Sequence, residues 1–317
     1  MIEINSLVRE RARQLGPPGE HWVAALPGLL AEMEQRWSIT TGPPLSGGSA
    51  AYVAPARMAD GRDAVLKLVV PDPDLTGQVR TMVEADGRGY ARVYASDVEQ
   101  HAMLIEALGP SLEDLRLAPE HTIDALCGTL RRAWQVAPWP GLTADPAREK
   151  ARALHGLVSR LWEQLGAPCP ERVVAQALDY ADRRAAAFRR DRCVVVHGDP
   201  HPGNILRAPT PRVGAESGYA FIDPDGFLAD PAYDLGVVLR DWCAELNAGD
   251  PSETARRYSR QLASRTGVDE TAIWEWGYLE RVSTGLYLTQ LGAAEWGRSF
   301  LATADRLVSG SRASSGG

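Results

Sequence analysis

Hydrophobic positions in the first third of the chain change from a helical to a strand-like spacing. Between residues 20 and 37, apolar side chains recur at helical intervals, which predicts a helix, although Pro27 would interrupt its hydrogen bonding. Two apolar runs at residues 51–57 and 64–70 then flank a turn at Asp60, and this arrangement predicts an antiparallel hairpin.

The pattern continues with more strands and then a long helical region. We expect a short helix over residues 75–85 and two strands over residues 90–94 and 102–106. A hinge follows at residues 107–110, and beyond it the spacing of apolar residues is mostly helical.

These elements together predict an α+β fold of two lobes. Residues 1–107 would form a small, β-rich N-lobe, and residues 108–308 a larger and mainly helical C-lobe. The last residues, 309–317, are rich in serine and glycine, and we expect them to be a disordered tail.

Composition and charge narrow the classes of partner. The chain has 317 residues, of which 44% are hydrophobic, and this is enough for a packed core. Its formal net charge of −7 disfavours a nucleic-acid partner and suits a cationic small molecule. The four cysteines are widely spaced, which predicts neither a disulfide framework nor a zinc site. The sequence shows no signal peptide and no long apolar run, so we expect a cytoplasmic protein without a membrane partner. The sequence leaves open whether it is a monomer or a homodimer.

The clearest chemistry lies in the sequence His-Gly-Asp-Pro-His-Pro-Gly-Asn at residues 197–204. An apolar run precedes it, so we expect a loop that follows a strand. Within the loop, Asp199 offers a carboxylate and Asn204 offers a carboxamide. A second carboxylate, that of Asp223, directly follows another short apolar run.

Phosphoryl transfer needs this set of groups. In protein kinases an aspartate positions the attacking hydroxyl, and an asparagine and a second aspartate hold Mg²⁺ on the triphosphate. We therefore predict Asp199 as the catalytic residue, and Asn204 and Asp223 as the metal ligands. Alternatively, His197, Asp199 and His201 could belong to the metal cluster of a hydrolase, but such a cluster draws on further histidines, and none follows His201.

Lys67 lies in the otherwise apolar run at residues 64–70. A lysine in such a strand needs either an anionic partner or an exposed edge. Kinases use a lysine on the third strand to bind the α- and β-phosphates, and we predict that role for Lys67. A glycine-rich turn before the hairpin could bring backbone amides to phosphate oxygens, or could be an ordinary turn. Its residues are Ser46, Gly47, Gly48 and Ser49.

Carboxylates in the C-terminal half could meet a cationic substrate. Aromatic and acidic side chains together suit a cation, although aromatic residues at helical spacing more often form a core. The candidate substrate-binding residues are Asp225, Asp230, Asp241, Glu245 and Glu280. Asp241 and Glu245 lie one helical turn apart and could equally form a solvated face. We expect Asp234, which opens a helical pattern, to cap the helix or to brace a loop.

The motifs at Lys67, at residues 197–204 and at Asp223 resemble those of the aminoglycoside phosphotransferase family. More narrowly, the chain resembles the branch of streptomycin 6-phosphotransferases and hydroxyurea kinases, because it shares the leading helix that ends at Trp37 and the hinge-like Met-Leu-Ile-Glu at residues 103–106. The resemblance implies a protein-kinase-like fold. It also implies a kinase that uses ATP (or GTP) and Mg²⁺ to phosphorylate a hydroxyl of an aminoglycoside, with streptomycin as the leading substrate.

By position, the resemblance implies that Glu106, Ala107 and Leu108 present backbone groups to the adenine. It also exposes one departure. Kinases pair the phosphate-binding lysine with a glutamate on a helix, and the matching position here is Gln78, while Glu84 lies further along. Either residue could face the lysine.

Two other functions remain open at this point. A kinase of the same fold could act on a metabolic acceptor such as choline, an amino alcohol or a sugar. A nucleotide-binding regulator without turnover would be consistent with Gln78, although Asp199, Asn204 and Asp223 are all present.

Overall fold

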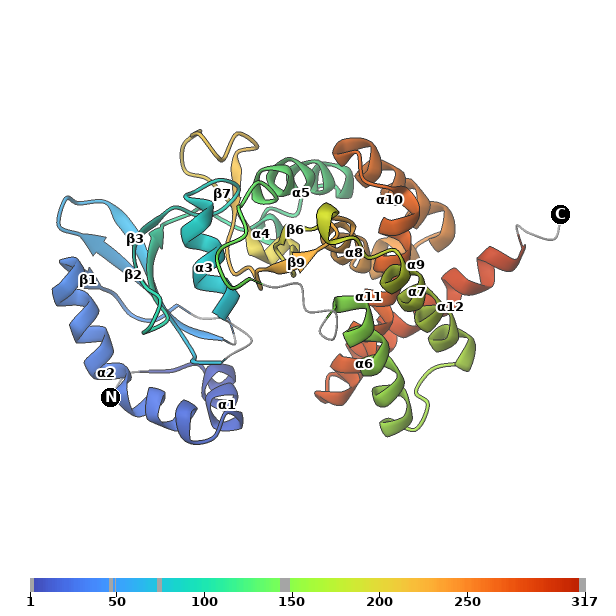
Figure 1. Cartoon of the computed structure of the whole chain (residues 1–317), viewed down its shortest axis with the longest axis horizontal. Helices are drawn as coiled ribbons and strands as arrows, with labels where there is room; N and C mark the ends of the chain where they lie inside the picture. Colours follow the sequence, from blue (N-terminus) through green and yellow to red (C-terminus); the bar gives the residue numbers. More distant parts are fainter. Residues whose placement is uncertain (1–2, 46–47, 49, 73–75, 143–148, 314–317) are drawn as a thin grey trace.

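The protein folds into two lobes (Figure 1). The structure describes residues 3–45, 48, 50–72, 76–142 and 149–313. In this computed structural model the sheet-containing N-lobe lies to the left in Figure 1, and the helical C-lobe lies to the right. The predicted two-lobed α+β fold is thereby confirmed. The division of the chain at residue 107 stays a prediction.

A five-stranded antiparallel sheet with the order β1-β2-β3-β5-β4 forms the centre of the N-lobe. The strands are β1 (Ile39–Thr41), β2 (Ala51–Met58), β3 (Asp63–Val69), β4 (Val93–Asp97) and β5 (Ala102–Glu106). The expected hairpin around Asp60 is formed by β2 and β3. β4 begins later than expected, because Tyr90 forms a bridge with Phe221 of the C-lobe instead of joining the strand.

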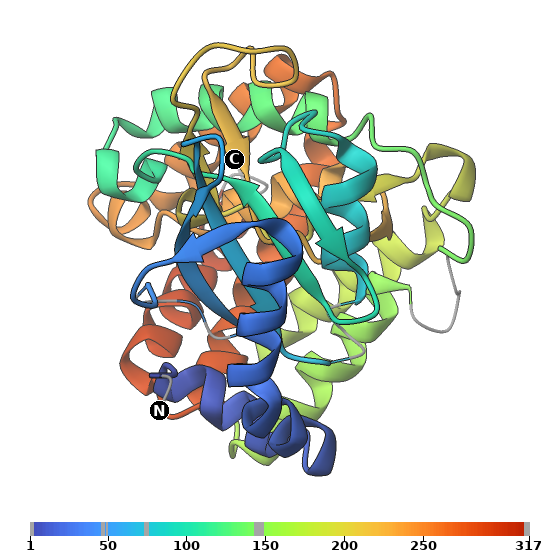
Figure 2. The ribbon, with the colours of Figure 1, turned by 90° about the vertical axis from the view of Figure 1, so that its left-hand side faces the viewer.

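The helices of the N-lobe are α1 (Ser6–Gln14), α2 (Pro17–Trp37) and α3 (Thr76–Ala85). Pro27 lies inside α2 without ending it. No helix was expected before residue 20, so α1 is a feature that the hydrophobic pattern did not reveal. Seen from the N-lobe side, α2 rises in front of the sheet and α1 lies below it (Figure 2).

The two faces of the sheet follow the alternation of side chains along each strand. Leu66 and Leu68 of β3 pack in one core cluster with Leu26 of α2. Lys67 and Val69 alternate with these leucines: Val69 belongs to the core shared with the C-lobe, and Lys67 lines the cleft between the lobes. The register of β3 therefore fixes Lys67 on the side where the chemistry lies.

The C-lobe is built from helices around α11, with two short antiparallel strand pairs, β6–β9 and β7–β8, near the N-lobe. Its α-helices are α4 (Leu112–Leu115), α5 (Pro119–Ala133), α6 (Lys150–Gln164), α7 (Glu171–Ala186), α8 (Ala232–Arg240), α9 (Cys243–Asn247), α10 (Pro251–Thr266), α11 (Glu270–Gln290) and α12 (Ala294–Ala313). Its strands and 3₁₀ helices are η2 (Arg190–Arg192), β6 (Val194–Val196), η3 (Pro202–Asn204), β7 (Ile205–Arg207), β8 (Tyr219–Phe221) and β9 (Phe227–Ala229).

The C-terminal helix is longer than expected. α12 continues to Ala313, into the stretch that was expected to be a tail, and a disordered end of the chain stays a prediction. Residues 314–317 lie outside the described part of the chain. Among the described helices, none is both long enough and apolar enough to cross a lipid bilayer.

Candidate active site

Two chain segments meet at the chemical centre of the cleft. The loop after β6 contains residues 197–204 and ends in η3, and Asp223 lies just beyond β8. β7 and β8 pair side by side, and the backbone N–H of Ile222 donates to the carbonyl oxygen of Asn204 over 2.9 Å. This small hairpin holds Asp223 beside the predicted catalytic loop.

The cleft at this point has a volume of about 740 Å³. It brings together four residues that are far apart in the sequence and that were predicted as one set, namely Lys67, Asp199, Asn204 and Asp223. Apolar side chains also line it, namely Ala51, Val53, Leu206 and Ile222. Apolar walls beside converging charged groups suit a ligand with a flat ring and an ionic tail.

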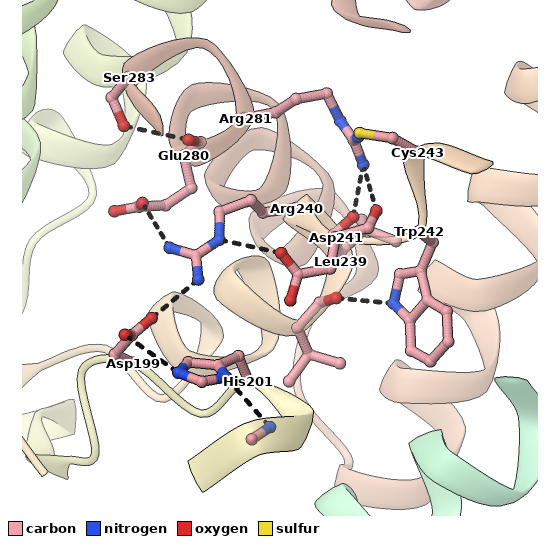
Figure 3. A network of polar contacts seen from close by, with 12 residues as sticks. Asp199, His201, Leu239, Arg240, Asp241, Trp242, Cys243, Glu280, Arg281 and Ser283 are labelled. Carbon is pink, nitrogen blue, oxygen red and sulfur yellow. Dashed lines mark hydrogen bonds and ion pairs between the residues drawn. The ribbon is translucent and has the colours of Figure 1, made fainter. Parts of the chain in front are cut away.

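The carboxylate of Asp199 is held by two neighbours. Its Oδ1 accepts a hydrogen bond from Nη2 of Arg240 over 2.8 Å, and Nε2 of His201 lies 3.7 Å from its Oδ2 (Figure 3). Burial by itself would raise the pKa of Asp199, but the charge of Arg240 and the neighbouring His201 hold that pKa below its ordinary value. The carboxylate is therefore ionised at neutral pH and can accept a hydrogen bond or a proton.

Arg240 is a residue of the site that sequence reasoning missed. It ends α8, and its guanidinium lies near three carboxylates: Asp199 at 2.8 Å, Asp241 at 3.4 Å and Glu280 at 3.6 Å (Figure 3). Burial would lower the pKa of Arg240, but these carboxylates together raise it, so the side chain stays charged. The signal in the sequence was an arginine directly after the apolar run at residues 235–239.

His197 orients the predicted catalytic loop. Its buried ring stacks on Tyr90 with 5.9 Å between the ring centroids. Nδ1 accepts from the backbone N–H of Asp199 over 3.2 Å, so Nε2 carries the proton and donates to the carbonyl oxygen of Ile222 over 2.8 Å. Burial lowers the pKa of His197 to about 4, which keeps the ring neutral at pH 7. With both ring nitrogens committed, His197 is not arranged as a metal ligand of a hydrolase.

Asp234 braces the same loop from α8, which is one of the two roles expected for it. Its Oδ1 accepts the backbone N–H of Gly198 over 2.8 Å. Its Oδ2 accepts the backbone N–H of His197 over 2.9 Å and the indole N–H of Trp134 over 2.8 Å. Burial raises the pKa of Asp234 to about 6, although these donors act in the opposite direction. One buried carboxylate thus fixes the start of the predicted catalytic loop.

Backbone conformation at two positions also shapes the site. Gly198 has φ +94°, and a Cβ atom there would lie 2.6 Å from the Cβ of Asp225, so the second residue of the motif has to be glycine. Asp223 has φ 59° in spite of its side chain. Such strained residues are frequent at functional sites, and here the strain falls on a predicted metal ligand.

Lys67 is buried, with 3% of its surface exposed, and its ammonium group is ion-paired with Asp223. The alternative of an exposed strand position is therefore wrong. Gln78 of α3 is buried and lines the same cleft, whereas Glu84 is exposed at the other end of α3. Of the two candidates, Gln78 is thus the one on the side of the lysine.

The hinge presents fewer groups to the cleft than expected. The backbone N–H of Glu106 donates to the carbonyl oxygen of Arg92 over 2.8 Å, and its carboxylate accepts from Arg212 over 2.5 and 3.0 Å. The hinge residues that line the cleft are Gly109 and Pro110, and Ser111, which caps α4, lines it next to them. The N–H of Glu106 is therefore committed within the protein, while nucleotide contacts of Ala107 and Leu108 stay predictions. In the glycine-rich turn, Gly48 lines the cleft, and Ser46, Gly47 and Ser49 lie outside the described residues.

Among the carboxylates predicted to meet a substrate, Asp225 lines the cleft. Burial raises its pKa to about 6, and the negative charges of Asp199 and Glu280 add to that effect. A cationic ligand would therefore favour the ionised form of Asp225.

The other four carboxylates are not among the described residues that line the cleft. They are Asp230, Asp241, Glu245, which is exposed on α9, and Glu280. Asp230 accepts the backbone N–H of Ala232 over 2.9 Å and so caps the start of α8. Glu280 is buried, accepts the hydroxyl of Tyr233 over 2.7 Å, and lies against Arg240. These contacts give Asp230 and Glu280 supporting roles within the protein.

The sequence also matches a known family. Residues 36–292 match the family described as aminoglycoside/hydroxyurea antibiotic resistance kinase. The chain belongs to this family. It is therefore a kinase that uses a hydroxyl group as the phosphoryl acceptor, and the predicted enzyme class is confirmed. Membership also disfavours the two readings without phosphoryl transfer, the metallohydrolase and the regulator.

Relatives are similar over most of their length. The chain is 30% identical to a streptomycin 6-kinase of Streptomyces glaucescens over 307 residues, which cover 93% of each chain. It is 31% identical to a hydroxyurea phosphotransferase of Kitasatospora aureofaciens, over 75% of this chain and 68% of the relative. Among solved structures, amicoumacin kinase hAmiN in complex with AMP-PNP, Ca²⁺ and Ami has a TM-score of 0.55 at 14% identity, covering 88% of this chain and 93% of that chain. The last similarity concerns the fold.

Proposed function

We propose that this kinase transfers the γ-phosphoryl group of ATP to a hydroxyl of a small cationic molecule of the streptomycin type. The observation that carries the proposal is the ionised carboxylate of Asp199, held by Arg240 in the same cleft as Lys67. The similarity to a streptomycin 6-kinase supports the class of acceptor. Because ATP is a donor of the cell interior, we propose a cytoplasmic reaction.

Asp199 is the catalytic residue of this proposal. Its carboxylate accepts a hydrogen bond from the attacking hydroxyl and orients the oxygen toward the γ-phosphorus. It takes the proton as the new oxygen–phosphorus bond forms and the bond between the γ-phosphorus and the departing ADP breaks. Arg240 is a positioning residue, because its bond to Oδ1 fixes the carboxylate and keeps it ionised. Oδ2, which faces His201 at the longer distance of 3.7 Å, is the oxygen better placed to receive the proton.

The nucleotide side of the cleft is formed by Lys67, Asn204 and Asp223. Lys67 binds phosphate oxygens, for which its ammonium has to leave the carboxylate of Asp223. The oxygens of Asn204 and Asp223 are hard donors of the kind that Mg²⁺ prefers, and the two residues are adjacent across β7 and β8. When bound there, Mg²⁺ would neutralise charge on the phosphates. The similar fold of a kinase bound to AMP-PNP and Ca²⁺ supports a nucleotide and a divalent ion.

The charge of the cleft favours a cationic acceptor. The carboxylates that line it within the described residues are Glu113, Asp114, Asp199, Asp223 and Asp225. The lysine and arginine side chains that line the same part of it are Lys67 and Arg11. Carboxylates therefore outnumber these cations in the described lining, so the field there is negative and attracts a polycation such as streptomycin.

The test is ADP release from ATP and Mg²⁺ against a panel of acceptors. The panel contains streptomycin, other aminoglycosides, hydroxyurea, choline and simple sugars. We expect release that depends on streptomycin or a close analogue. Release with choline or a sugar and none with an aminoglycoside would keep the kinase and refute the acceptor class, and ATP binding without release on any acceptor would refute the proposal as a whole.

A further inference from the structure

Arg11 of the N-terminal helix α1 lines the same cleft as the proposed catalytic residues, a position that the sequence pattern gave no reason to expect. Its Nε and Nη2 donate to Oδ2 of Asp72 over 3.1 and 2.7 Å. The side chain of Asp72 is mostly buried, whereas that of Arg11 keeps 35% of its surface exposed. A guanidinium held from one side and open on the other is suited to bind a second anion.

Asp72 holds this guanidinium close to the start of β2. The backbone N–H of Val70 donates to the carbonyl oxygen of Ala50 over 2.9 Å, and the backbone N–H of Asp72 donates to Val70 over 2.7 Å. Ala50 and Gly48 line the cleft together with Arg11. Arg11 of α1 is thus tied through Asp72 to the chain just beyond β3, the strand that carries Lys67, and it lines the cleft beside the residues that precede β2.

The helix α1 is fixed firmly enough to position a side chain. Val8 and Ala12 are 1% exposed and belong to the core between α1, α2 and the sheet. The backbones of α1 and α2 approach so closely that a Cβ atom at Gly19 would lie 1.9 Å from the carbonyl oxygen of Ala12. In both views of the ribbon, α1 lies beside α2 along the N-lobe (Figure 1 and Figure 2).

We propose that Arg11 is a second phosphate-binding cation of the nucleotide site and that it contacts the β- or γ-phosphate. This inference rests on the proposed use of ATP. Nε and Nη2 of Arg11 donate to Asp72. Nη1 of Arg11 makes no hydrogen bond within the described residues, so the N–H groups of Nη1 can donate to a phosphate oxygen. The charge balance gives the reason: the triphosphate carries several negative charges, and in the described lining the cations available to it are Lys67 and Arg11.

The experiment measures the binding of ATP, ADP and AMP, each with Mg²⁺ and without an acceptor, to the full chain by titration calorimetry. Arg11→Ala should weaken ATP binding about tenfold, the loss expected for one charge-assisted hydrogen bond at a partly exposed site, and should leave AMP binding within about twofold. Loss for ADP and ATP together would assign the contact to the β-phosphate. Loss for ATP alone would assign it to the γ-phosphate.

The control is Arg13→Ala on the same helix, because Arg13 is exposed and pairs with Glu10 away from the cleft. It should leave the binding of all three nucleotides unchanged. Arg11→Gln is the second variant, in case the alanine variant disrupts α1. It removes the charge but keeps part of the aliphatic side chain.

Two outcomes overturn the inference. Unchanged ATP binding in both Arg11 variants would show that the guanidinium makes no phosphate contact. An equal loss for AMP and ATP would show that Arg11 acts by holding the N-lobe in shape. If the unaltered protein binds none of the three nucleotides, the proposed function itself fails and the inference falls with it.

Discussion

Arg240 donates a hydrogen bond from Nη2 to Oδ1 of Asp199 over 2.8 Å, and this contact joins the end of α8 to the catalytic loop. Asp241 and Glu280 hold the same guanidinium from other sides. The helix α8 therefore sets the position of the proposed catalytic carboxylate. In the proposed mechanism no residue of α8 contacts a substrate.

Replacement of Arg240 by alanine should lower kcat about 10²-fold, because the carboxylate of Asp199 would no longer be held in place. Burial raises the pKa of Asp199, whereas the charge of Arg240 lowers that pKa. Loss of Arg240 should therefore raise the pKa of Asp199. Asp199 acts in its ionised form, and the acid limb of the kcat profile should therefore move to higher pH. Arg240→Lys should restore part of both effects.

The control for this variant is Arg260→Ala, since Arg260 is exposed on α10. It should leave kcat and its pH profile unchanged. A low kcat in Arg240→Ala with an unshifted acid limb would contradict the electrostatic part of the account.

The metal assignment concerns Asn204 and Asp223. Asn204→Ala and Asp223→Ala should each raise the Mg²⁺ concentration needed for half-maximal activity or abolish turnover, because each removes an oxygen ligand. Titration of activity with Mg²⁺ checks this, with Asp191→Asn as the control, since Asp191 is exposed and pairs with Arg189. An unchanged Mg²⁺ titration in either ligand variant would refute that ligand.

The partner of Lys67 can be tested on α3. Glu84 is exposed, so Glu84→Gln should leave the KM for ATP within about twofold of the unaltered protein. Gln78 is buried in the cleft, and Gln78→Ala should raise that KM severalfold. A large rise in Glu84→Gln would mean that α3 moves so as to bring Glu84 to the lysine when the nucleotide binds.

His197 should make the protein less stable in acid. Burial lowers its folded pKa to about 4, while the unfolded chain binds the proton near the ordinary value of 6.5. The stabilising effect of the neutral ring is thus complete above the unfolded pKa and is lost as the pH falls toward 4. Between pH 7 and pH 5 the loss is about 2 kcal/mol.

The measurement is the free energy of unfolding in urea at pH 7 and at pH 5, without Mg²⁺. His197→Gln should be less stable at pH 7 but should lack this part of the pH dependence. His21→Gln, at an exposed position of α2, should keep it. An equal pH dependence in the unaltered protein and in His197→Gln would contradict the buried, neutral state of the ring.

Most of the correct predictions came from local sequence patterns. The hairpin of β2 and β3 and the inward direction of Lys67 follow from the alternation of apolar residues and one turn. The grouping of Asp199, Asn204 and Asp223 follows from two short motifs, each directly after a strand. In these cases the chemistry depends on residues close in sequence or on a motif with a fixed order.

The errors arose where packing between distant segments decides the outcome. Asp241 and Glu245 were expected on one helix, but Trp242 has φ 70° and the chain turns between α8 and α9. The contact of Arg240 depends on the docking of α8 against the catalytic loop, which apolar spacing does not encode. Likewise, the place of Arg11 in the cleft depends on the packing of α1 onto α2 and the sheet.

The most direct test of the central claim is the transfer of the γ-phosphoryl group itself. ATP labelled in the γ-phosphate is incubated with Mg²⁺, streptomycin and either the unaltered protein or Asp199→Asn, and the acceptor is analysed by mass spectrometry. The account predicts singly phosphorylated streptomycin with the unaltered protein, a rate lower by about 10²–10⁴-fold with Asp199→Asn, and similar ATP binding by both. Phosphorylation at an equal rate by Asp199→Asn would contradict the role of this carboxylate.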